Sequence, residues 1–184
     1  MNICSEMLLQ RIFFVFSVAL LFSIQSFAQI TTKPNPTLVT SEADIQAIRQ
    51  IFQKINSSNL SKQHFTYESS GCVEDGEVNY FLDNNKIVKI TEAGAIGDGS
   101  WVNEFYYNEG KVIFCVETIV GGPAIGKETK TQYRYYIKDN RAIRIMEGTK
   151  IISNDSKAAD ALRVASRIYK AYTTKNFASA LCDD

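Results

Sequence analysis

The sequence predicts an α+β domain: an N-terminal helix, an antiparallel meander of six or seven strands, and a C-terminal helix packed on one sheet face. Apolar residues recur at helical spacing over about 42–56, alternate with period two from His64 to Ile152, and return to helical spacing from Ala158 to about Tyr172. The chain has 184 residues, of which 45% are hydrophobic and 22% charged. Such a composition is typical of one globular domain with a substantial core.

The first 28 residues have the pattern of a secretory signal peptide. Arg11 precedes an apolar run from Ile12 to Ile24, and Ser26-Phe27-Ala28 places small residues at the two positions that signal peptidase reads. The run is shorter than the roughly 20 residues of a membrane-spanning helix. We therefore expect cleavage after Ala28, export to the periplasm or the extracellular space, and no stable membrane span after cleavage. An uncleaved N-terminal anchor is the alternative.

Each predicted helix has a recognisable start. Residues 29–40 contain Pro34 and Pro36 and no periodicity, which predicts an extended leader before a single domain over 41–184. Ser41-Glu42-Ala43-Asp44 is typical of a capping box and predicts the start of the first helix. Ser153-Asn154-Asp155 offers a cap for the second helix, which needs the sheet as its apolar partner.

Three similar segments predict three β-hairpins, each with aromatic residues, a tight polar turn, a basic residue and an apolar strand. Their two-residue turns are Asn84-Asn85, Glu109-Gly110 and Asp139-Asn140. A strand near His64–Glu68 would be the seventh. The hairpins resemble those of small exported bacterial β-hairpin-repeat proteins of uncharacterised function. The resemblance covers about 75–152, is structural, and carries over no functional residue.

A two-residue turn fixes the register of its hairpin, so the two sheet faces can be written down. One face pairs large aromatic with branched aliphatic residues, and we expect both helices to cover it: Phe81 with Val88, Tyr106 with Ile113, Tyr136 with Ile143, and beside them Ile90, Cys115 and Ile145. The other face alternates aromatic and basic residues, in the pairs Tyr80–Lys89, Phe105–Phe114 and Tyr135–Arg144.

This second face holds the predicted ligand-binding residues, Tyr80, Lys89, Phe105, Phe114, Tyr135 and Arg144. Its Tyr–Lys and Tyr–Arg pairs suit cation–π contact. If exposed, it would be a platform for an envelope glycan, a small ligand or a protein partner. The alternative is that the sheet curls and these aromatic side chains fill a barrel interior or a second layer.

The catalytic and metal-binding signals are weak. Lys+Arg 20 against Asp+Glu 20 gives no net charge, which argues against a general nucleic-acid binder. His64 is the only histidine, and no serine-nucleophile motif accompanies it. If the second and third hairpins are adjacent, Glu104 and Arg134 can form an ion pair at the margin of the core. The acidic cluster Glu74, Asp75 and Glu77 lacks the spacing of a calcium loop. We expect no metal and no cofactor.

The function expected from these observations is an exported, non-enzymatic binding module. One alternative is a hydrolase that uses Glu104 or His64. Another is an inhibitor or interaction protein that uses the loop tips at 94–101 and 121–127, where Trp101 is either a core plug or a rim contact.

Export would leave Cys72, Cys115 and Cys182 in an oxidising compartment, where two of the three can pair. We favour Cys72–Cys182, because that bond would tie down the C-terminal tail, while Cys115 lies in an apolar strand. The other two pairings, and three reduced thiols, remain open.

Overall fold

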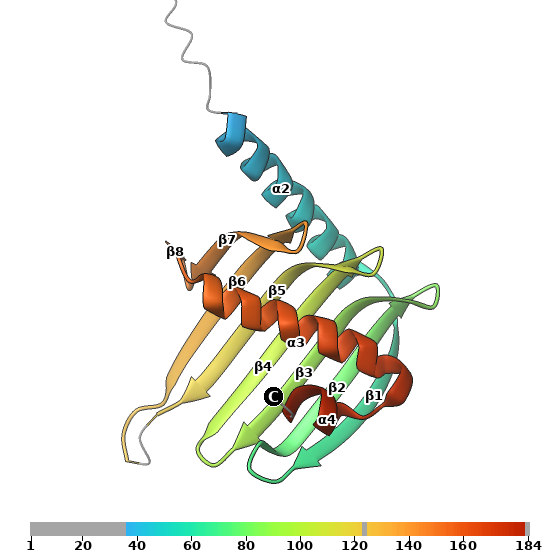
Figure 1. Cartoon of the computed structure of the whole chain (residues 1–184), viewed down its shortest axis with the longest axis vertical. Helices are drawn as coiled ribbons and strands as arrows, with labels where there is room; N and C mark the ends of the chain where they lie inside the picture. The colour runs from blue at the N-terminus through green and yellow to red at the C-terminus, as the bar shows by residue number, and fades with distance from the viewer. Residues whose placement is uncertain (1–35, 123–124, 183–184) are drawn as a thin grey trace, which may run out of the picture. The chain divides into compact units, whose positions relative to one another are not determined.

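The computed structural model describes residues 36–122 and 125–182 and has the predicted α+β class (Figure 1). Its elements are α2 (Pro36–Ser57), β1 (Ser61–Ser69), β2 (Val73–Asp83), β3 (Lys86–Ile96), β4 (Gly99–Asn108), β5 (Lys111–Gly121), β6 (Thr129–Lys138), β7 (Arg141–Glu147), β8 (Lys150–Ile152), α3 (Asp155–Thr174) and α4 (Phe177–Cys182). None of the helices in these two ranges is long and apolar enough to cross a membrane. The predicted signal peptide lies outside the described residues.

Helix α2 begins at Pro36, so the prediction of an extended chain over 36–40 is wrong. A proline is tolerated at the first helical position because that position needs no backbone N–H donor. The acidic residues assigned to a capping box therefore lie inside the helix, where Glu42 pairs with Arg144 and Asp44 with Lys138. Residues 29–35 of the predicted leader lie outside the described residues.

The sheet has eight antiparallel strands in sequence order, one more than the upper prediction. The additional strand, β8, has only three residues, too few to produce a period-two pattern. Segment 94–99 is mostly strand, since β3 and β4 are joined by a tight turn at Gly97 and Asp98. The meander itself is confirmed.

All three predicted two-residue turns are present, and every turn residue has positive φ. After two paired positions beyond each turn, however, the returning strand bulges. Leu82 pairs with Ile87 but Phe81 pairs with Lys89, so Val88 is the extra residue. The same shift occurs in the other two hairpins, at Ile113 and Ile143. A one-residue shift reverses the face of every later side chain, so the predicted pairs Phe81–Val88, Tyr106–Ile113 and Tyr136–Ile143 are wrong.

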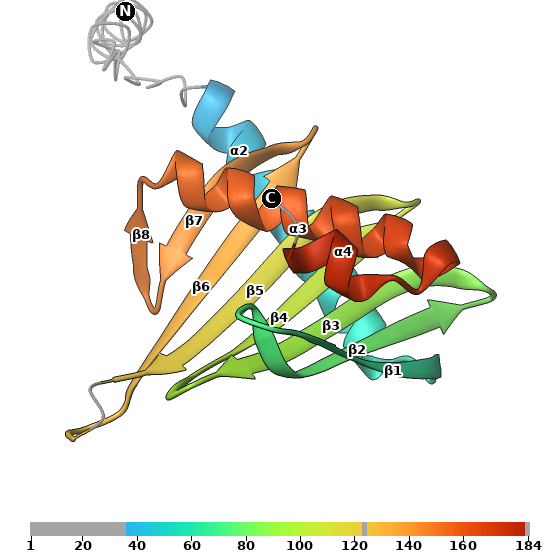
Figure 2. The same cartoon turned by 60° about the horizontal axis from the view of Figure 1, so that its bottom comes forward.

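The helices cover opposite faces of the sheet, not the same face as predicted. Figures 1 and 2 show α3 and α4 on one side and α2 on the other. The larger core lies under α3 and α4 and includes Tyr80, Ile90, Phe105, Tyr135 and Ile168. The smaller core lies under α2 and includes Ile45, Ile48, Tyr106, Phe114 and Tyr136. Both faces are apolar because both are covered.

Helix α3 is held on the sheet by tyrosine hydroxyls as well as apolar packing. The hydroxyl of Tyr80 donates to the Ile168 carbonyl at 2.7 Å, and that of Tyr107 to the Ala165 carbonyl at 2.8 Å. The predicted cap is confirmed at Asn154, whose side chain accepts from the backbone N–H of Lys157.

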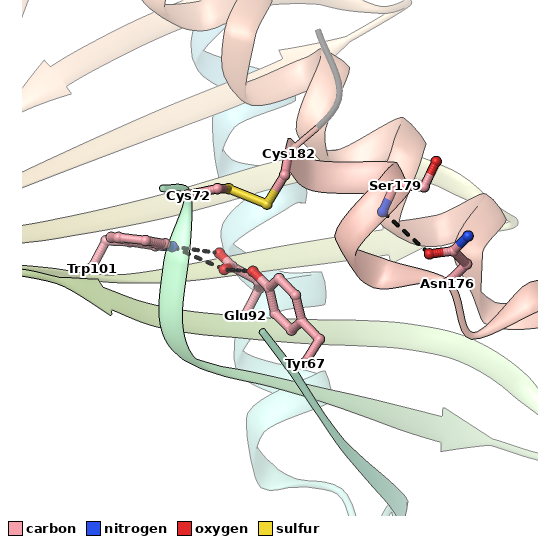
Figure 3. The surroundings of a disulfide bond; sticks show 7 residues. All are labelled: Tyr67, Cys72, Glu92, Trp101, Asn176, Ser179 and Cys182. Carbon is pink, nitrogen blue, oxygen red and sulfur yellow. Dashed lines mark hydrogen bonds between the residues drawn. A yellow bond between two sulfur atoms is a disulfide. The ribbon is translucent and has the colours of Figure 1, made fainter. Parts of the chain in front are cut away.

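The C-terminal helix α4 is tied to the β1–β2 turn by a disulfide between Cys72 and Cys182, the pairing favoured from the sequence (Figure 3). Their Cα atoms are 5.9 Å apart and 110 positions separate them in the chain. Cys115 is a buried free thiol, whose pKa is raised by burial. It serves as a small apolar side chain of the larger core.

Candidate functional site

The six predicted ligand-binding residues do not share one face. Tyr80, Phe105 and Tyr135 belong to the core under α3 and α4, whereas Phe114 belongs to the core under α2. The exposed-platform prediction is wrong, because these four side chains are at most 5% exposed. The hairpin bulges explain the error, since they move Lys89, Phe114 and Arg144 to the face opposite the other three residues.

An alternation of basic and aromatic residues does exist, on the α2 side and with a different membership. Paired positions on seven neighbouring strands form this row, which we call the α2-face row: Lys62, Phe81, Lys89, Tyr106, Phe114, Tyr136 and Arg144. The Lys89 ammonium lies 4.9 Å from the ring centroid of Tyr106 and 5.7 Å from that of Phe81. The row therefore provides cation–π contacts beneath α2, but the predicted pairs Tyr80–Lys89 and Tyr135–Arg144 are wrong.

A groove of about 590 Å³ lies between α2 and the middle of this row. Its floor is aromatic, since the ring of Phe114 lies 5.9 Å from that of Tyr106 and 4.8 Å from that of Tyr136. Phe52 of α2 packs against this floor, 5.3 Å from the Phe114 ring. The helix wall is completed by Ile48, Arg49, Gln53 and Asn56, and the opposite wall by Glu104, Val116, Gln132 and Arg134. The groove thus has an apolar base and polar rims.

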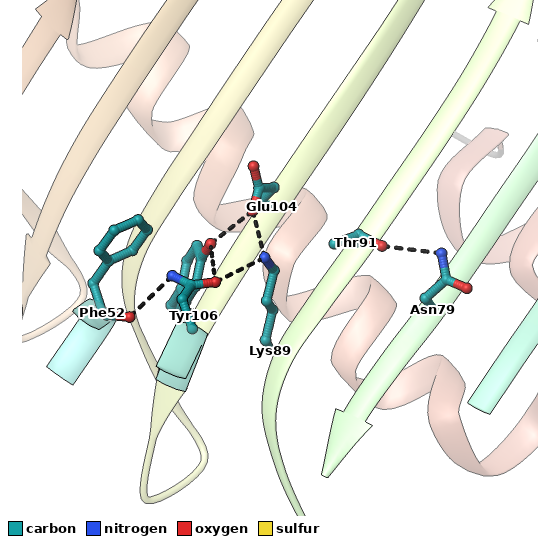
Figure 4. Close-up of polar contacts among 7 residues, drawn as sticks. Phe52, Asn79, Lys89, Thr91, Glu104 and Tyr106 are labelled. Carbon is teal, nitrogen blue, oxygen red and sulfur yellow. Dashed lines mark hydrogen bonds and ion pairs between the residues drawn. The ribbon is translucent and has the colours of Figure 1, made fainter. Parts of the chain in front are cut away.

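One end of the groove holds a closed polar cluster (Figure 4). The Lys89 ammonium lies 2.6 Å from the Glu104 carboxylate, which also accepts the Tyr106 hydroxyl at 2.6 Å. Asn56 Oδ1 accepts from Lys89 at 3.2 Å and from Tyr106 at 3.3 Å. Burial opposes ionisation of Glu104, but hydrogen bonds from Lys89 and Tyr106 and the Lys89 charge outweigh it and lower the pKa of Glu104. This end of the groove therefore holds an ion pair whose two charges cancel.

The other end holds two arginines beside Tyr136. Arg49 Nε donates to the Tyr136 hydroxyl at 3.4 Å, and its guanidinium lies 5.6 Å from the centroid of that ring. Arg134, two residues before Tyr136 on β6, donates from Nη2 to the Gly148 carbonyl. Its Nε is buried and bonds to no acceptor in the part of the chain that the structure describes. The two ends of the groove therefore differ in charge.

The predicted ion pair between Glu104 and Arg134 is wrong, because Val116 of β5 lies between them in the same row of the sheet. His64 also lies in this row, on the edge strand β1, and contacts Asn79 Oδ1 at 2.8 Å. Three strand spacings separate it from Glu104, or roughly 14 Å. His64 and Glu104 therefore form no joint acid–base site.

A second polar cluster lies under α4, beside the disulfide (Figure 3). The Glu92 carboxylate is 2% exposed and accepts from Tyr67 at 2.7 Å, from Trp101 at 2.9 and 3.0 Å, and from Asn103 at 2.8 Å. Burial raises the pKa of Glu92, against the effect of these hydrogen bonds. No group of three or more metal-ligating side chains occurs within 36–122 and 125–182.

Sequence reasoning missed the contributions of α2 to the groove. Arg49, Gln53 and Asn56 follow one another at helical spacing beside the apolar stripe, which was the available signal. A larger hollow of about 1120 Å³ lies around the turns at Asn84 and Glu109. It is lined largely by turn residues and by side chains from both sheet faces, so it lacks the single aromatic floor of the groove.

No protein-family model matches the chain, and neither a curated protein nor a solved structure matches it significantly.

Proposed function

We propose that this chain is a non-enzymatic binding module whose groove between α2 and the sheet takes a small ligand with an apolar body. The observation that carries the proposal is the aromatic floor of Tyr106, Phe114 and Tyr136 beneath polar rims. Ligand sites commonly combine an apolar lining with a few polar groups that fix orientation. The volume of about 590 Å³ suits a molecule of one or two rings.

The chemistry of the groove supports binding over hydrolysis. A general base works best with a pKa near the operating pH, but the pKa of Glu104 is lowered and its charge is neutralised by Lys89. The hydroxyl of Tyr106 already donates to Glu104, and burial raises the pKa of Tyr106 further from neutrality. Lys89, Glu104 and Tyr106 therefore bond to one another and are not arranged as a general acid and base.

We also propose that the module is exported. The segment that resembles a signal peptide motivates this proposal, and the disulfide between Cys72 and Cys182 supports it, because structural disulfides persist in oxidising compartments. Expression with and without residues 1–28, followed by fractionation and N-terminal sequencing, tests it. Recovery of the full-length chain, uncut after Ala28, in the cytosol would contradict it.

A neutral fluorescent dye, N-phenyl-1-naphthylamine, tests the binding proposal. We expect saturable binding to the wild-type chain. Gln53→Trp places a bulky indole at the groove rim, where it should block part of the space that the dye occupies. We expect binding to weaken by about tenfold, which corresponds to roughly 1.4 kcal/mol of lost dye contact. Gln50→Trp is the matched control, since Gln50 is exposed on the same helix and does not line the groove.

Circular dichroism and thermal unfolding establish that both variants fold. No saturable binding to the wild-type chain, or equal effects of the two substitutions, would disprove the use of this groove.

A further inference from the structure

We propose that the groove selects an amphipathic anion, with the anionic head bound at Arg134 and Arg49 and the apolar body lying on Phe114. This inference rests on the proposed function, because it names the class of ligand for the same groove. It is carried by the distribution of charge around α2, which differs between the two ends of the groove.

The acidic side chains near α2 are already engaged. Glu104 pairs with Lys89 at 2.6 Å, Asp44 with Lys138 at 2.7 Å, and Glu42 with Arg144. Over the described ranges, neither Arg49 nor Arg134 forms an ion pair with a carboxylate. Two positive charges thus remain at one groove after the neighbouring acids have been paired.

Both arginines lie at the Tyr136 end. Arg49 reaches Tyr136 from the helix, and Arg134 lies two residues before Tyr136 on the same face of β6. They line the groove from opposite walls, so both charges attract an anion bound at this end. The Lys89–Glu104 pair occupies the Tyr106 end and adds no net charge there. The charge of the groove is therefore asymmetric, with a cationic end, an aromatic middle and an end without net charge.

Arg134 is the stronger of the two contacts that we infer. A guanidinium offers five N–H donors in a planar fork that matches the oxygens of a carboxylate, sulfonate or phosphate. Only its Nη2 has a described acceptor, the carbonyl of Gly148, while its buried Nε has none. Buried polar groups are normally hydrogen-bonded. A shift of the Arg134 side chain that opens Nε to the groove would let an anionic oxygen satisfy this donor.

Two dyes with the same aromatic skeleton separate this inference from the proposed function. 8-Anilino-1-naphthalenesulfonate is N-phenyl-1-naphthylamine with an added sulfonate. If the groove selects anions, the sulfonate dye binds the wild-type chain about tenfold more tightly or better. Its advantage falls as salt is raised from about 50 to 500 mM, since screening weakens partly exposed charge pairs.

The variant Arg134→Gln is expected to weaken binding of the sulfonate dye by about tenfold, and to weaken it more than binding of the neutral dye. Arg141→Gln, which removes an exposed arginine on β7 outside the groove, is the matched control and changes neither. Arg49→Gln should act in the same direction as Arg134→Gln with a smaller effect. Should Arg134→Gln fail to fold, Arg49→Gln and the salt dependence of the wild-type chain decide the inference.

Competition identifies the head group. Decanoate and decyl phosphate should displace the sulfonate dye, whereas decyltrimethylammonium should not, and the stronger competitor names the preferred anion. Equal affinity for the two dyes, or equal displacement by the cationic amphiphile, would overturn anion selection while leaving apolar binding intact. Absence of binding by both dyes would instead overturn the proposed function, and this inference with it.

Discussion

The indole N–H of Trp101 donates to both carboxylate oxygens of Glu92, at 2.9 and 3.0 Å, across neighbouring strands. Its ring covers Gly94, where an added Cβ would lie 2.3 Å from a ring carbon. Trp101 is partly buried and lies outside both apolar cores, and it contacts the Glu92 cluster from the neighbouring strand. Tyr67 and Asn103 complete the set of donors, so neutral groups alone hold a buried carboxylate next to the disulfide.

Replacing Glu92 by alanine should destabilise the fold by about 2–5 kcal/mol, because it leaves buried donors of Tyr67, Trp101 and Asn103 without their acceptor. Urea unfolding monitored by circular dichroism measures this loss. Gly76→Ala is no control, since a Cβ there would meet Tyr67. Glu77→Ala is suitable, because Glu77 is an exposed carboxylate nearby on β2. A loss below about 1 kcal/mol for Glu92→Ala would contradict the role assigned to the cluster.

Glu92 also predicts a pH dependence. Burial raises its pKa in the folded state above the ordinary value of 4.5, so the unfolded chain releases this proton first. The free energy of unfolding of the wild-type chain should therefore fall, relative to that of Glu92→Gln, as pH rises from about 4.5 through the folded-state pKa. Paired urea titrations between pH 4 and 8 (about one per pH unit) measure the difference. A difference that is flat or rises with pH would refute the raised pKa.

The disulfide between Cys72 and Cys182 should contribute about 4–5 kcal/mol, since it closes a loop across 110 positions. Cys72→Ser/Cys182→Ser is compared with the wild-type chain in oxidising and reducing buffer. The wild-type chain should lose stability on reduction and approach the double variant, which should not respond to the reductant. Cys115→Ser serves as the control for the third thiol, which is buried and unbridged. Equal stability of oxidised and reduced wild-type chains would disprove the contribution.

The hairpin turns were predictable because the two central residues of such a turn need positive φ, which favours Asn and Gly. The bulges were not, because Val88, Ile113 and Ile143 are apolar residues among other apolar residues and fit either face. An unrecognised bulge reverses the faces of the returning strand. It therefore misplaced Lys89, Phe114 and Arg144 relative to Tyr80, Phe105 and Tyr135.

The helical pattern of α2 alone did not identify the sheet face that this helix covers. An apolar stripe predicts that a helix packs, but it does not identify the sheet face on which it packs. Apolar residues on both faces were the available signal, since a solvated face should be mainly polar. The groove follows from this placement, because Arg49 and Asn56 come from the helix while Tyr106 and Arg134 come from the sheet.

Removing Lys89 should change the sign of the pKa shift at Glu104. Without its partner, Glu104 keeps the burial that raises its pKa and loses the hydrogen bond and charge that lower it. Lys89→Met should therefore cost about 1–3 kcal/mol at neutral pH. In the wild-type chain, the stability contributed by Glu104 is present above pH 4.5 and is lost as pH falls through its lowered folded-state pKa.

A double-mutant cycle with Lys89→Met and Glu104→Gln measures the coupling, which we expect to exceed about 1 kcal/mol. The exposed pair Arg163–Asp160 on α3 is the reference, with a coupling of at most about 0.5 kcal/mol. Equal coupling energies for the two pairs would contradict a special stabilising role for the Lys89–Glu104 pair.

A substitution in the turn between β4 and β5 should stabilise the fold. Glu109 has φ of 51°, a left-handed conformation that Asn adopts more readily, and the corresponding positions in the other hairpins hold Asn84 and Asp139. Glu109→Asn should therefore raise the free energy of unfolding by about 0.5–1 kcal/mol. Gly110→Ala should lower it, because Gly110 has φ of 75° and a Cβ there would lie 3.3 Å from the Tyr169 hydroxyl. Urea unfolding distinguishes the two effects, and a loss of stability in Glu109→Asn would show that the Glu109 side chain, rather than its backbone, determines the turn.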